Sequence, residues 1–546
     1  MGMSDDVAKL LQTIGLQAAD QLLARQAAEI DRLRSFENDS ERLKYCTSAN
    51  KRLWTEYAPV SIDSGDIHIE DPVHQQVTIE SEIAPIFRHP LLQRLGHIKQ
   101  LSFSYLTYPT ATHTRLSHSL GVCKNAETAL SAILQRGVLY TRSEETLSIP
   151  LTAKEQRVLL RKAKVSALLH DIGHGPFGHG LDQLLVDSDE DDPVPDKIHG
   201  VRFIEDFLED AIKRCPDLQK EDILRILQKN TLGLEDYDVL IKEIIDSPLD
   251  VDRMDYLVRD AHLTGLSLGT VNVQALISRM VPFLETSQSG QQSQIVLVFL
   301  PSAVPYITHL LYARDSMYLN CYEHPRKLVA EKMLMRAVQE FRSHHAISIH
   351  DLLLMTDEQL LRLLFENSNT NDLSYEYARA LLQNDILFEQ VFEFRPRERD
   401  IWEKRNNAGP DTPGGPPRPS EAVKEWGRKR LSYERKFRSR PKEFEEDIAK
   451  GAGLDDSDRW KVMITVPSEG LYQRKDEKIR ILTTENGVYD YTTWDKCAGF
   501  WEDVLERLGV ERYCFRVFIH RDLYKKREDI IRAAEDCLTD KDKAAA

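Results

Sequence analysis

The sequence predicts a mainly α-helical protein with a small α+β subdomain near its C-terminal end. Apolar residues recur at helical intervals at the start, as at Leu10, Leu11 and Ile14, and nearly every segment from residue 83 to about residue 400 has a helical pattern. Runs rich in β-branched and aromatic residues occur at 460–466, 478–482 and 514–519, with helical patterns near 496–508 and 522–537. We therefore expect a large helical core and a smaller mixed unit.

Four segments follow one another along the chain. Residues 1–58 are expected to form an N-terminal helical arm for packing or oligomerisation, and residues 59–400 a helical core with its extension. Residues 401–425 are rich in proline and glycine, which sustain neither helix nor strand, and they predict a linker or long loop. Residues 426–546 then form the C-terminal α+β subdomain, which begins with a basic segment.

Two short stretches of the core are expected to depart from the helical pattern. Residues 60–63 and 67–70 alternate between apolar and polar side chains around Ser64 and Gly65, which predicts a hairpin. The most apolar run, residues 295–300, ends at Pro301 and indicates a buried strand or a helix start. It is far too short to span a bilayer.

Composition narrows the class of partner. The 546 residues carry a formal net charge of -16, which argues against a protein that coats nucleic acid or membranes through its overall field. The seven cysteines are scattered without CxxC spacing, so neither a disulfide framework nor a zinc ribbon is expected. With no secretory signal pattern at the start, we expect a cytoplasmic protein without a membrane partner.

The adjacent pair His170-Asp171 carries the strongest chemical signal. It follows the apolar run 165–169 and places an imidazole and a carboxylate side by side where a helix leaves the core. His118 opens another apolar helix, and Asp252 lies on a third helical pattern. Two histidines and two aspartates make a nitrogen-and-oxygen set that suits zinc, iron or manganese. Such a set leaves metal positions for water and a phosphate oxygen.

A longer comparison narrows this pattern to one family. The blocks are residues 71–74, 93–101, 108–109, 118–122, 170–177, 252–256 and 259–260, followed by Arg314 and Tyr322. In order and spacing they resemble the HD-domain deoxynucleoside triphosphate triphosphohydrolases, a family that includes the SAM-and-HD-domain enzymes and bacterial dGTPase-like HD phosphohydrolases. The resemblance covers roughly residues 65 to 345 and implies an HD-domain helical core. No SAM domain is part of the match.

The resemblance implies a set of catalytic and metal-binding residues. The implied metal ligands are His118, His170, Asp171 and Asp252, for a divalent iron, manganese or zinc ion, with magnesium on the substrate phosphates as a further cation. The implied acid-base and charge-stabilising groups are His174, His179, Asp182 and His199. For Asp182 in particular, helix capping and loop packing is the alternative role.

The resemblance also implies a substrate pocket. Arg115, Arg253 and Arg314 match positions facing the triphosphate, whose charge of about four needs cationic side chains. Gln100, Leu101, Tyr256, Asp260 and Tyr322 match residues around the deoxyribose and base. Tyr256 and Leu101 would pack near C2′ and exclude a 2′-hydroxyl, although a place in the core explains both equally well.

Three further features bear on regulation. Where guanine-activated members of the family carry an aspartate and an arginine, this chain has Arg88 and Gly96, so a nucleotide activator other than GTP, or none, is expected. The acidic stretch 187–196 predicts a solvated loop, with a gate as the alternative. The basic stretch 424–442, interleaved with aromatic residues, predicts a solvated helix, with nucleotide or single-strand binding as the alternative.

The predicted function is hydrolysis of deoxynucleoside triphosphates to deoxynucleosides and inorganic triphosphate. The resemblance implies in-line attack of metal-activated water on the α-phosphorus while a histidine assists the departing 5′ oxygen, in a homo-oligomer that controls the nucleotide pool or depletes it against viruses. One alternative is an HD phosphohydrolase that acts on another nucleotide or on nucleic acid. Another, of a different class, is a nucleotide-sensing regulatory module that has lost turnover.

Overall fold

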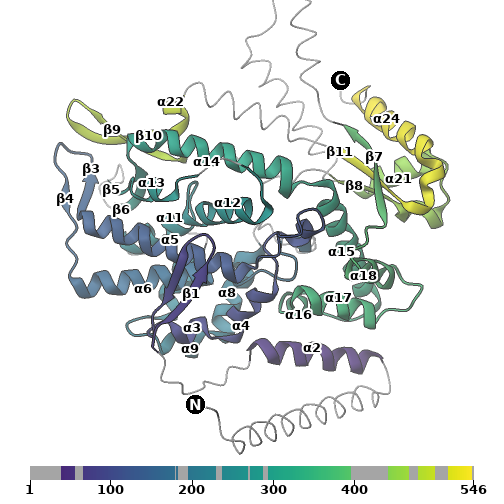
Figure 1. Ribbon diagram of the computed structural model, residues 1–546, viewed down its shortest axis with the longest axis horizontal. Helices are drawn as coiled ribbons and strands as arrows, with labels where there is room; N and C mark the ends of the chain where they lie inside the picture. Colours follow the sequence, from purple (N-terminus) through teal and green to yellow (C-terminus); the bar gives the residue numbers. More distant parts are fainter. Residues whose placement is uncertain are drawn as a thin grey trace, which may run out of the picture.

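The computed structural model describes residues 39–55, 65–178, 180–181, 195–228, 236–267, 271–286, 293–394, 441–465, 478–498 and 515–543. Most of the predicted N-terminal arm, the predicted linker at 401–425 and nearly all of the basic stretch lie outside these ranges. Over the described residues the fold is mainly α, as the sequence predicts (Figure 1). In this part of the chain no helix has the length and apolarity needed to cross a bilayer.

The core is a set of helices around one large apolar cluster. Its helices are α3 (Ala84–Phe87), α4 (Pro90–Gln93), α5 (Arg115–Arg136), α6 (Ala153–Leu169), α8 (Pro195–Phe207), α9 (Glu209–Lys213), α10 (Lys220–Leu227), α11 (Asp236–Ile245), α12 (Val251–Thr264), α13 (Val273–Ile277) and α14 (Val304–Met317). Short 3-10 segments η1 (Arg94–His97), η2 (Ser102–Leu106) and η3 (Pro301–Ala303) and the π-helical turn η4 (Tyr318–Tyr322) join them. The long helices α5 and α6 pack side by side in its centre.

Local sequence signals place the ends of the two central helices. Helix α5 begins after Thr114, whose side chain accepts a hydrogen bond from the Ser117 amide, and ends at Gly137, which has a φ of 65°. Helix α6 begins with a capping box between Thr152 and Glu155 and ends with His170 as its C-cap. These caps place the residues after Thr114 in the first turn of α5 and His170 at the end of α6.

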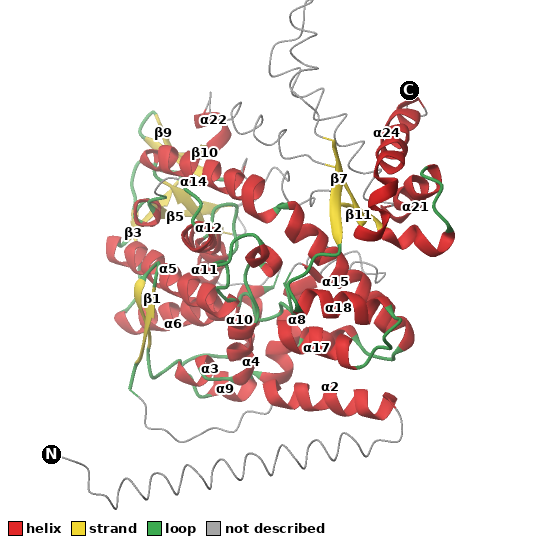
Figure 2. Cartoon of the chain, turned by 45° about the vertical axis from the view of Figure 1, so that its right-hand side comes forward, coloured by secondary structure: helices red, strands yellow, loops and turns green. Residues whose placement is uncertain are grey.

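A second helical cluster follows the core. Its elements are α15 (Pro325–His344), α16 (Ile349–Leu353), α17 (Asp357–Glu366) and α18 (Leu373–Leu382), and the N-terminal helix α2 (Asp39–Thr55) lies below them (Figure 2). The Trp54 indole donates a hydrogen bond to Gln359 over 3.1 Å, which ties α2 to α17. The described part of the predicted arm therefore packs against this chain's own helices.

The predicted strand at 67–70 is present, and it has a partner that the sequence did not indicate. The observed hairpin pairs β1 (Ile67–Asp71) with β2 (Gln75–Ile79) and turns at residues 72–74. Asp71 accepts hydrogen bonds from the amides of Val73 and His74, at 2.9 and 2.8 Å, and thereby closes the turn. The predicted strand at 60–63 lies outside the described residues.

A six-stranded sheet corrects the nearly all-helical prediction for residues 83–400. Its order is β10 (Val488–Thr493), β9 (Arg480–Glu485), β6 (Ser293–Phe299), β5 (Met280–Thr286), β3 (Val138–Thr141) and β4 (Leu147–Ser148). The apolar run at 295–300 is therefore a buried strand, one of its two predicted alternatives. The two C-terminal strands β9 and β10 extend this core sheet, which the sequence did not indicate.

The remaining strands form a three-stranded sheet at the other end of the molecule (Figure 1). Its order is β7 (Phe388–Phe394), β11 (Phe515–His520) and β8 (Val462–Thr465), and α21 (Pro441–Gly451) and α24 (Arg527–Lys543) pack on it. Also described are the short helix α22 (Trp494–Ala498) and the 3-10 segments η5 (Asp456–Lys461) and η8 (Arg521–Lys526). The C-terminal strands are thus divided between two sheets.

Candidate metal centre and active site

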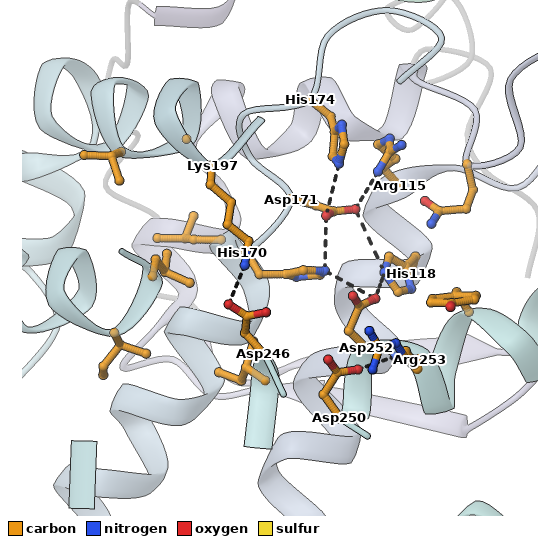
Figure 3. Close-up of a pocket in the computed structure, with 18 residues that line it drawn as sticks. Arg115, His118, His170, Asp171, His174, Lys197, Asp246, Asp250, Asp252 and Arg253 are labelled. Carbon is orange, nitrogen blue, oxygen red and sulfur yellow. Dashed lines mark hydrogen bonds and ion pairs between the residues drawn. The ribbon is translucent and has the colours of Figure 1, made fainter. Parts of the chain in front are cut away.

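Three helices bring the predicted metal ligands to one point (Figure 3). His118 lies in the first turn of α5, His170 and Asp171 follow the last turn of α6, and Asp252 lies in the first turn of α12. Because these helix ends meet, residues distant in sequence become neighbours.

The distances within this group suit a shared cation. Nε2 of His118 lies 2.9 Å from Oδ1 of Asp252, and Nε2 of His170 lies 3.8 Å from the same oxygen. One ligand atom from each of these three residues lies within 4.8 Å of the others, among the described residues. Asp171 adjoins them, with Oδ1 3.3 Å from Nε2 of His170 and Oδ2 3.9 Å from Nε2 of His118. The four predicted ligands are therefore brought together.

The hydrogen bonds behind the two imidazoles turn their Nε2 atoms toward the cluster. Nδ1 of His118 lies 2.9 Å from the carboxylate of Asp255, and Nδ1 of His170 lies 2.7 Å from the Ala167 carbonyl. Both oxygens only accept, so each Nδ1 carries the proton and each Nε2 keeps its lone pair in the neutral ring. Nε2 of His170 is also buried without a hydrogen bond to a described residue. This donor set fits a divalent transition metal.

The electrostatics of the cluster favour a cation. Burial lowers the pKa of His118, but hydrogen bonds to Asp252 and Asp255 outweigh it and raise that pKa to about 10. Burial raises the pKa of Asp252, yet the nearby imidazoles of His118 and His170 outweigh this effect and bring that pKa well below its usual range. The negative charge of the carboxylates therefore favours a positive charge at this point. A divalent ion bound there would supply that charge and replace the proton on the imidazole.

A second layer of buried charge supports His118. Asp255, which holds Nδ1 of His118, also lies 2.6 Å from Nε2 of His74 and accepts a hydrogen bond from Arg259 over 2.9 Å. Arg259 in turn donates to Asp71 over 2.7 Å. A side chain at Gly121 would collide with Asp255, so the glycine is required by this packing. Asp255 and Arg259 lie within the matched blocks 252–256 and 259–260, but the sequence predicted no role for them.

A pocket of about 320 Å³ opens onto the cluster (Figure 3). Of the predicted site residues, Gln100, Arg115, His118, His170, Asp171, His174, Asp252, Arg253 and Tyr256 line it. Arg115 donates to Oδ2 of Asp171 over 2.7 Å, and Nε2 of His174 lies 3.5 Å from Oδ1 of the same carboxylate. Asp171 is therefore held between the metal cluster and these two side chains.

Several predicted site residues do not line this pocket. Leu101 is buried in the apolar core. Asp260 accepts hydrogen bonds from His113 and Tyr322, each at 2.7 Å, and the Tyr322 ring lies 6.3 Å from that of Tyr256, so this group backs the tyrosine that lines the pocket. Arg314 and His199 do not line the pocket. His179 and Asp182 lie outside the described residues.

The pocket also holds charged residues that sequence reasoning missed. Lys197 pairs with Asp246 at one side of the pocket, and Asp250 accepts a hydrogen bond from the Arg253 amide over 2.8 Å as the N-cap of α12. The guanidinium of Arg253 bonds to the carbonyls of Ser247 and Pro248. The available signal for Asp250 was its place as an N-cap residue directly before the helical pattern 251–264.

Comparison with known proteins agrees with this geometry. Residues 115–260 match the HD domain, and residues 289–394 match the HD associated region. The chain thus contains an HD domain. All four predicted metal ligands of this HD-domain protein fall within its HD match.

Similar proteins include both uncharacterised and named HD proteins. An uncharacterised protein of Methanocaldococcus jannaschii is 28% identical over 61% of this chain and 62% of its own length. The deoxynucleoside triphosphate triphosphohydrolase SAMHD1 of Homo sapiens is 25% identical over 49% of this chain and 44% of its own length. This HD-domain chain thus spans about half the length of the curated relatives that it matches. A phosphohydrolase structure from Bacteroides thetaiotaomicron shares the fold, with a TM-score of 0.57 at 20% identity over 84% of this chain and 100% of that one.

Proposed function

We propose that this HD-domain protein hydrolyses deoxynucleoside triphosphates to deoxynucleosides and inorganic triphosphate, with a divalent transition metal as cofactor. The observation that carries the proposal is a single pocket that joins the His118, His170, Asp171 and Asp252 cluster to cationic side chains and a tyrosine. When bound, a divalent iron, manganese or zinc ion would polarise phosphate oxygen and make water a better nucleophile.

Cationic side chains support a polyphosphate substrate. Arg115 and Arg253 line the pocket, and Lys197 lies at another part of its wall. The Arg115 guanidinium already holds Asp171, so a phosphate oxygen at the cluster would lie near a fixed positive charge. Magnesium on the outer phosphates would neutralise the remaining charge. Burial raises the pKa of Tyr256. The positive charge of Arg314 lies close enough to oppose that rise in part.

The other side of the pocket supports recognition of a sugar. Oε1 of Gln100 is buried, lines the pocket and makes no hydrogen bond to a described residue, so it is available to accept one from a substrate hydroxyl. The Tyr256 ring packs 6.4 Å from the His118 ring and 6.3 Å from that of Tyr322, which fixes its position. We propose that this fixed ring leaves no room for a 2′-hydroxyl.

His174 is the proposed partner of the departing 5′ oxygen. Its Nε2 faces Asp171 at 3.5 Å, and it is nearly fully buried in the pocket wall. An imidazole held by a carboxylate can donate a proton to a leaving oxygen or stabilise its charge. His199, His179 and Asp182 keep their predicted supporting roles as part of the proposal.

Product analysis tests the reaction class. Each deoxynucleoside triphosphate and each ribonucleotide would be incubated with the protein and Mn²⁺, singly and in pairs, and the products separated by chromatography. Release of inorganic triphosphate from deoxynucleotides is the expected result. Release of pyrophosphate or monophosphate would indicate another HD phosphohydrolase, and binding without any product would indicate a nucleotide-sensing module.

The wider biological predictions rest on the family resemblance alone. We propose a homo-oligomer that acts in the cytoplasm on the deoxynucleotide pool, with antiviral depletion as one use. The pairwise assays detect a nucleotide activator, since one nucleotide would then raise hydrolysis of the other. Sedimentation of the full chain with and without nucleotides tests assembly.

A further inference from the structure

A fully buried arginine lies directly behind the pocket wall. Arg94, at the start of η1, makes no salt bridge among the described residues, yet both of its terminal guanidinium nitrogens donate to backbone carbonyls, while its buried Nε has no hydrogen-bond partner there. One terminal nitrogen donates to the carbonyls of Leu353 and Met355, at 2.7 and 3.3 Å, and the other to those of Ile172 and His174, both at 2.9 Å. The planar fork of arginine is what allows one side chain to bind two chain segments in this way.

Asp357 makes a second link between the same parts of the molecule. One carboxylate oxygen accepts a hydrogen bond from the Phe177 amide over 2.7 Å, and the other accepts one from the Lys99 amide over 3.0 Å. Phe177 has a φ of 57°, a backbone conformation that a side chain rarely adopts without such support. Asp357 is nearly fully buried, so both bonds are shielded from water.

The two links converge on the residues that carry the proposed chemistry. Residues 172–178 form the loop that bears His174, and Lys99 immediately precedes Gln100. Residues 353–357 belong to the HD associated region. A side chain at Gly175 would collide with Leu353, so the loop and this region also pack without space between them.

We propose that Arg94 and Asp357 are positioning residues through which the HD associated region holds His174 and Gln100 in the pocket wall. This inference rests on the proposed function for the roles of those two residues. The HD match alone supplies the metal cluster. Residues 353–357 then complete the wall on the side where the leaving group and the sugar would lie.

Two variants test the positioning roles. Arg94→Lys keeps the charge but offers a compact ammonium that cannot span both pairs of carbonyls, and Asp357→Asn presents an amide N–H to one of the two backbone N–H groups. We expect kcat to fall about 10- to 100-fold in each, because small displacements of catalytic groups cost this much, while Mn²⁺ affinity measured by calorimetry stays unchanged. Arg336→Lys is the matched control, because Arg336 also binds carbonyls of two residues, Trp460 and Val462, remote from the pocket.

A double-mutant cycle separates positioning from general destabilisation. In a His174→Ala background, Arg94→Lys should lower kcat by less than about threefold, because the group that it positions is already gone. An equal loss in both backgrounds, or full activity of Arg94→Lys in the wild-type background, would overturn the proposal.

Hydrogen exchange provides a readout that needs neither a substrate nor a variant with normal stability. Amides of residues 172–178 should exchange faster in Asp357→Asn and Arg94→Lys but not in Arg336→Lys. Unchanged protection of this loop would refute the positioning roles even if the protein hydrolyses deoxynucleotides. Faster exchange without any triphosphate release by the wild type would instead refute the proposed function, and the positioning roles of Arg94 and Asp357 would still hold. If Arg94→Lys does not fold, Asp357→Asn alone decides the exchange result.

Discussion

Two buried clusters of charge in this molecule differ in what they leave unsatisfied. In the C-terminal part, Glu445 of α21 accepts hydrogen bonds from Lys332, from Arg336 over 2.7 Å and from the Ile464 amide over 3.0 Å. At the HD site, two histidines and two aspartates meet at a pocket, and Nε2 of His170 makes no hydrogen bond among the described residues. Both clusters are largely withdrawn from solvent, but of the two only the second presents unused ligand atoms to an open space.

The comparison shows that burial of charge and a shifted pKa do not by themselves identify a functional site. Burial raises the pKa of Glu445, and Lys332 and Arg336 outweigh it and lower that pKa. The pKa of Asp252 is lowered by the same balance of effects, with histidines as partners. What differs is the identity of the partners and the access of a ligand. A neutralised, fully bonded carboxylate serves structure, whereas imidazoles beside carboxylates at a cavity serve metal binding.

The largest expected effect on activity follows loss of the adjacent metal ligands His170 and Asp171. His170→Ala combined with Asp171→Ala should lower triphosphate release at least about a thousandfold, because two of four metal ligands are lost. The unfolding free energy of the metal-free protein should fall as well, by up to about 3–5 kcal/mol, because buried Arg115 loses its carboxylate partner, so activity is compared per folded protein. Chelation of the wild type should produce the same loss of activity, and added Mn²⁺ should restore the wild type alone. Activity surviving in the double variant would place the chemistry elsewhere.

Glu445→Ala should lower stability without lowering activity. It leaves the charges of Lys332 and Arg336 buried without their carboxylate, which costs about 3–5 kcal/mol of unfolding free energy. Specific activity of the folded fraction should stay unchanged. The carboxylate pKa is depressed, so its contribution is present above about pH 4.5 and is lost as the pH falls further. Urea unfolding at pH 7 and below pH 4 should therefore separate wild type from variant mainly at pH 7.

These two clusters also differ in how far the sequence predicts them. His118, His170, Asp171 and Asp252 were predictable because the metal constrains residue type and order, and each lies at a helix end marked by its own pattern. Glu445 gave no such signal, since its partners lie more than 100 residues away on α15 and are chosen by packing. For the same reason the pairing of β9 with β6 could not be predicted. Strand partners depend on register and on which edge the folded core leaves available.

The supporting layer of the HD site should show an intermediate effect. Asp255→Asn keeps the shape of the side chain but weakens the acceptor that orients the His118 ring, and loss of such a partner typically costs 10- to 100-fold in metal affinity, so about that loss is expected here. Calorimetric titration with Mn²⁺ measures it. Asp351→Asn is a suitable control, because Asp351 bonds only locally to Ser348 at the start of α16. An unchanged affinity in Asp255→Asn would mean that the helix ends alone orient His118.

The smallest expected effect belongs to an ion pair with a short distance whose side chains are both about half exposed. Arg142, directly after β3, and Asp490 of β10 meet at 3.1 Å, with side chains 51% and 47% exposed. Water and salt screen such a pair, so Arg142→Ala should lower the unfolding free energy by no more than about 0.5 kcal/mol. Urea unfolding at low and high salt measures this. A loss close to that of Glu445→Ala would contradict the comparison, because short distance alone would then rank the charge clusters. If the loss is small, burial decides what a charge cluster contributes to stability, and unsatisfied ligand atoms at a cavity decide which cluster is a site.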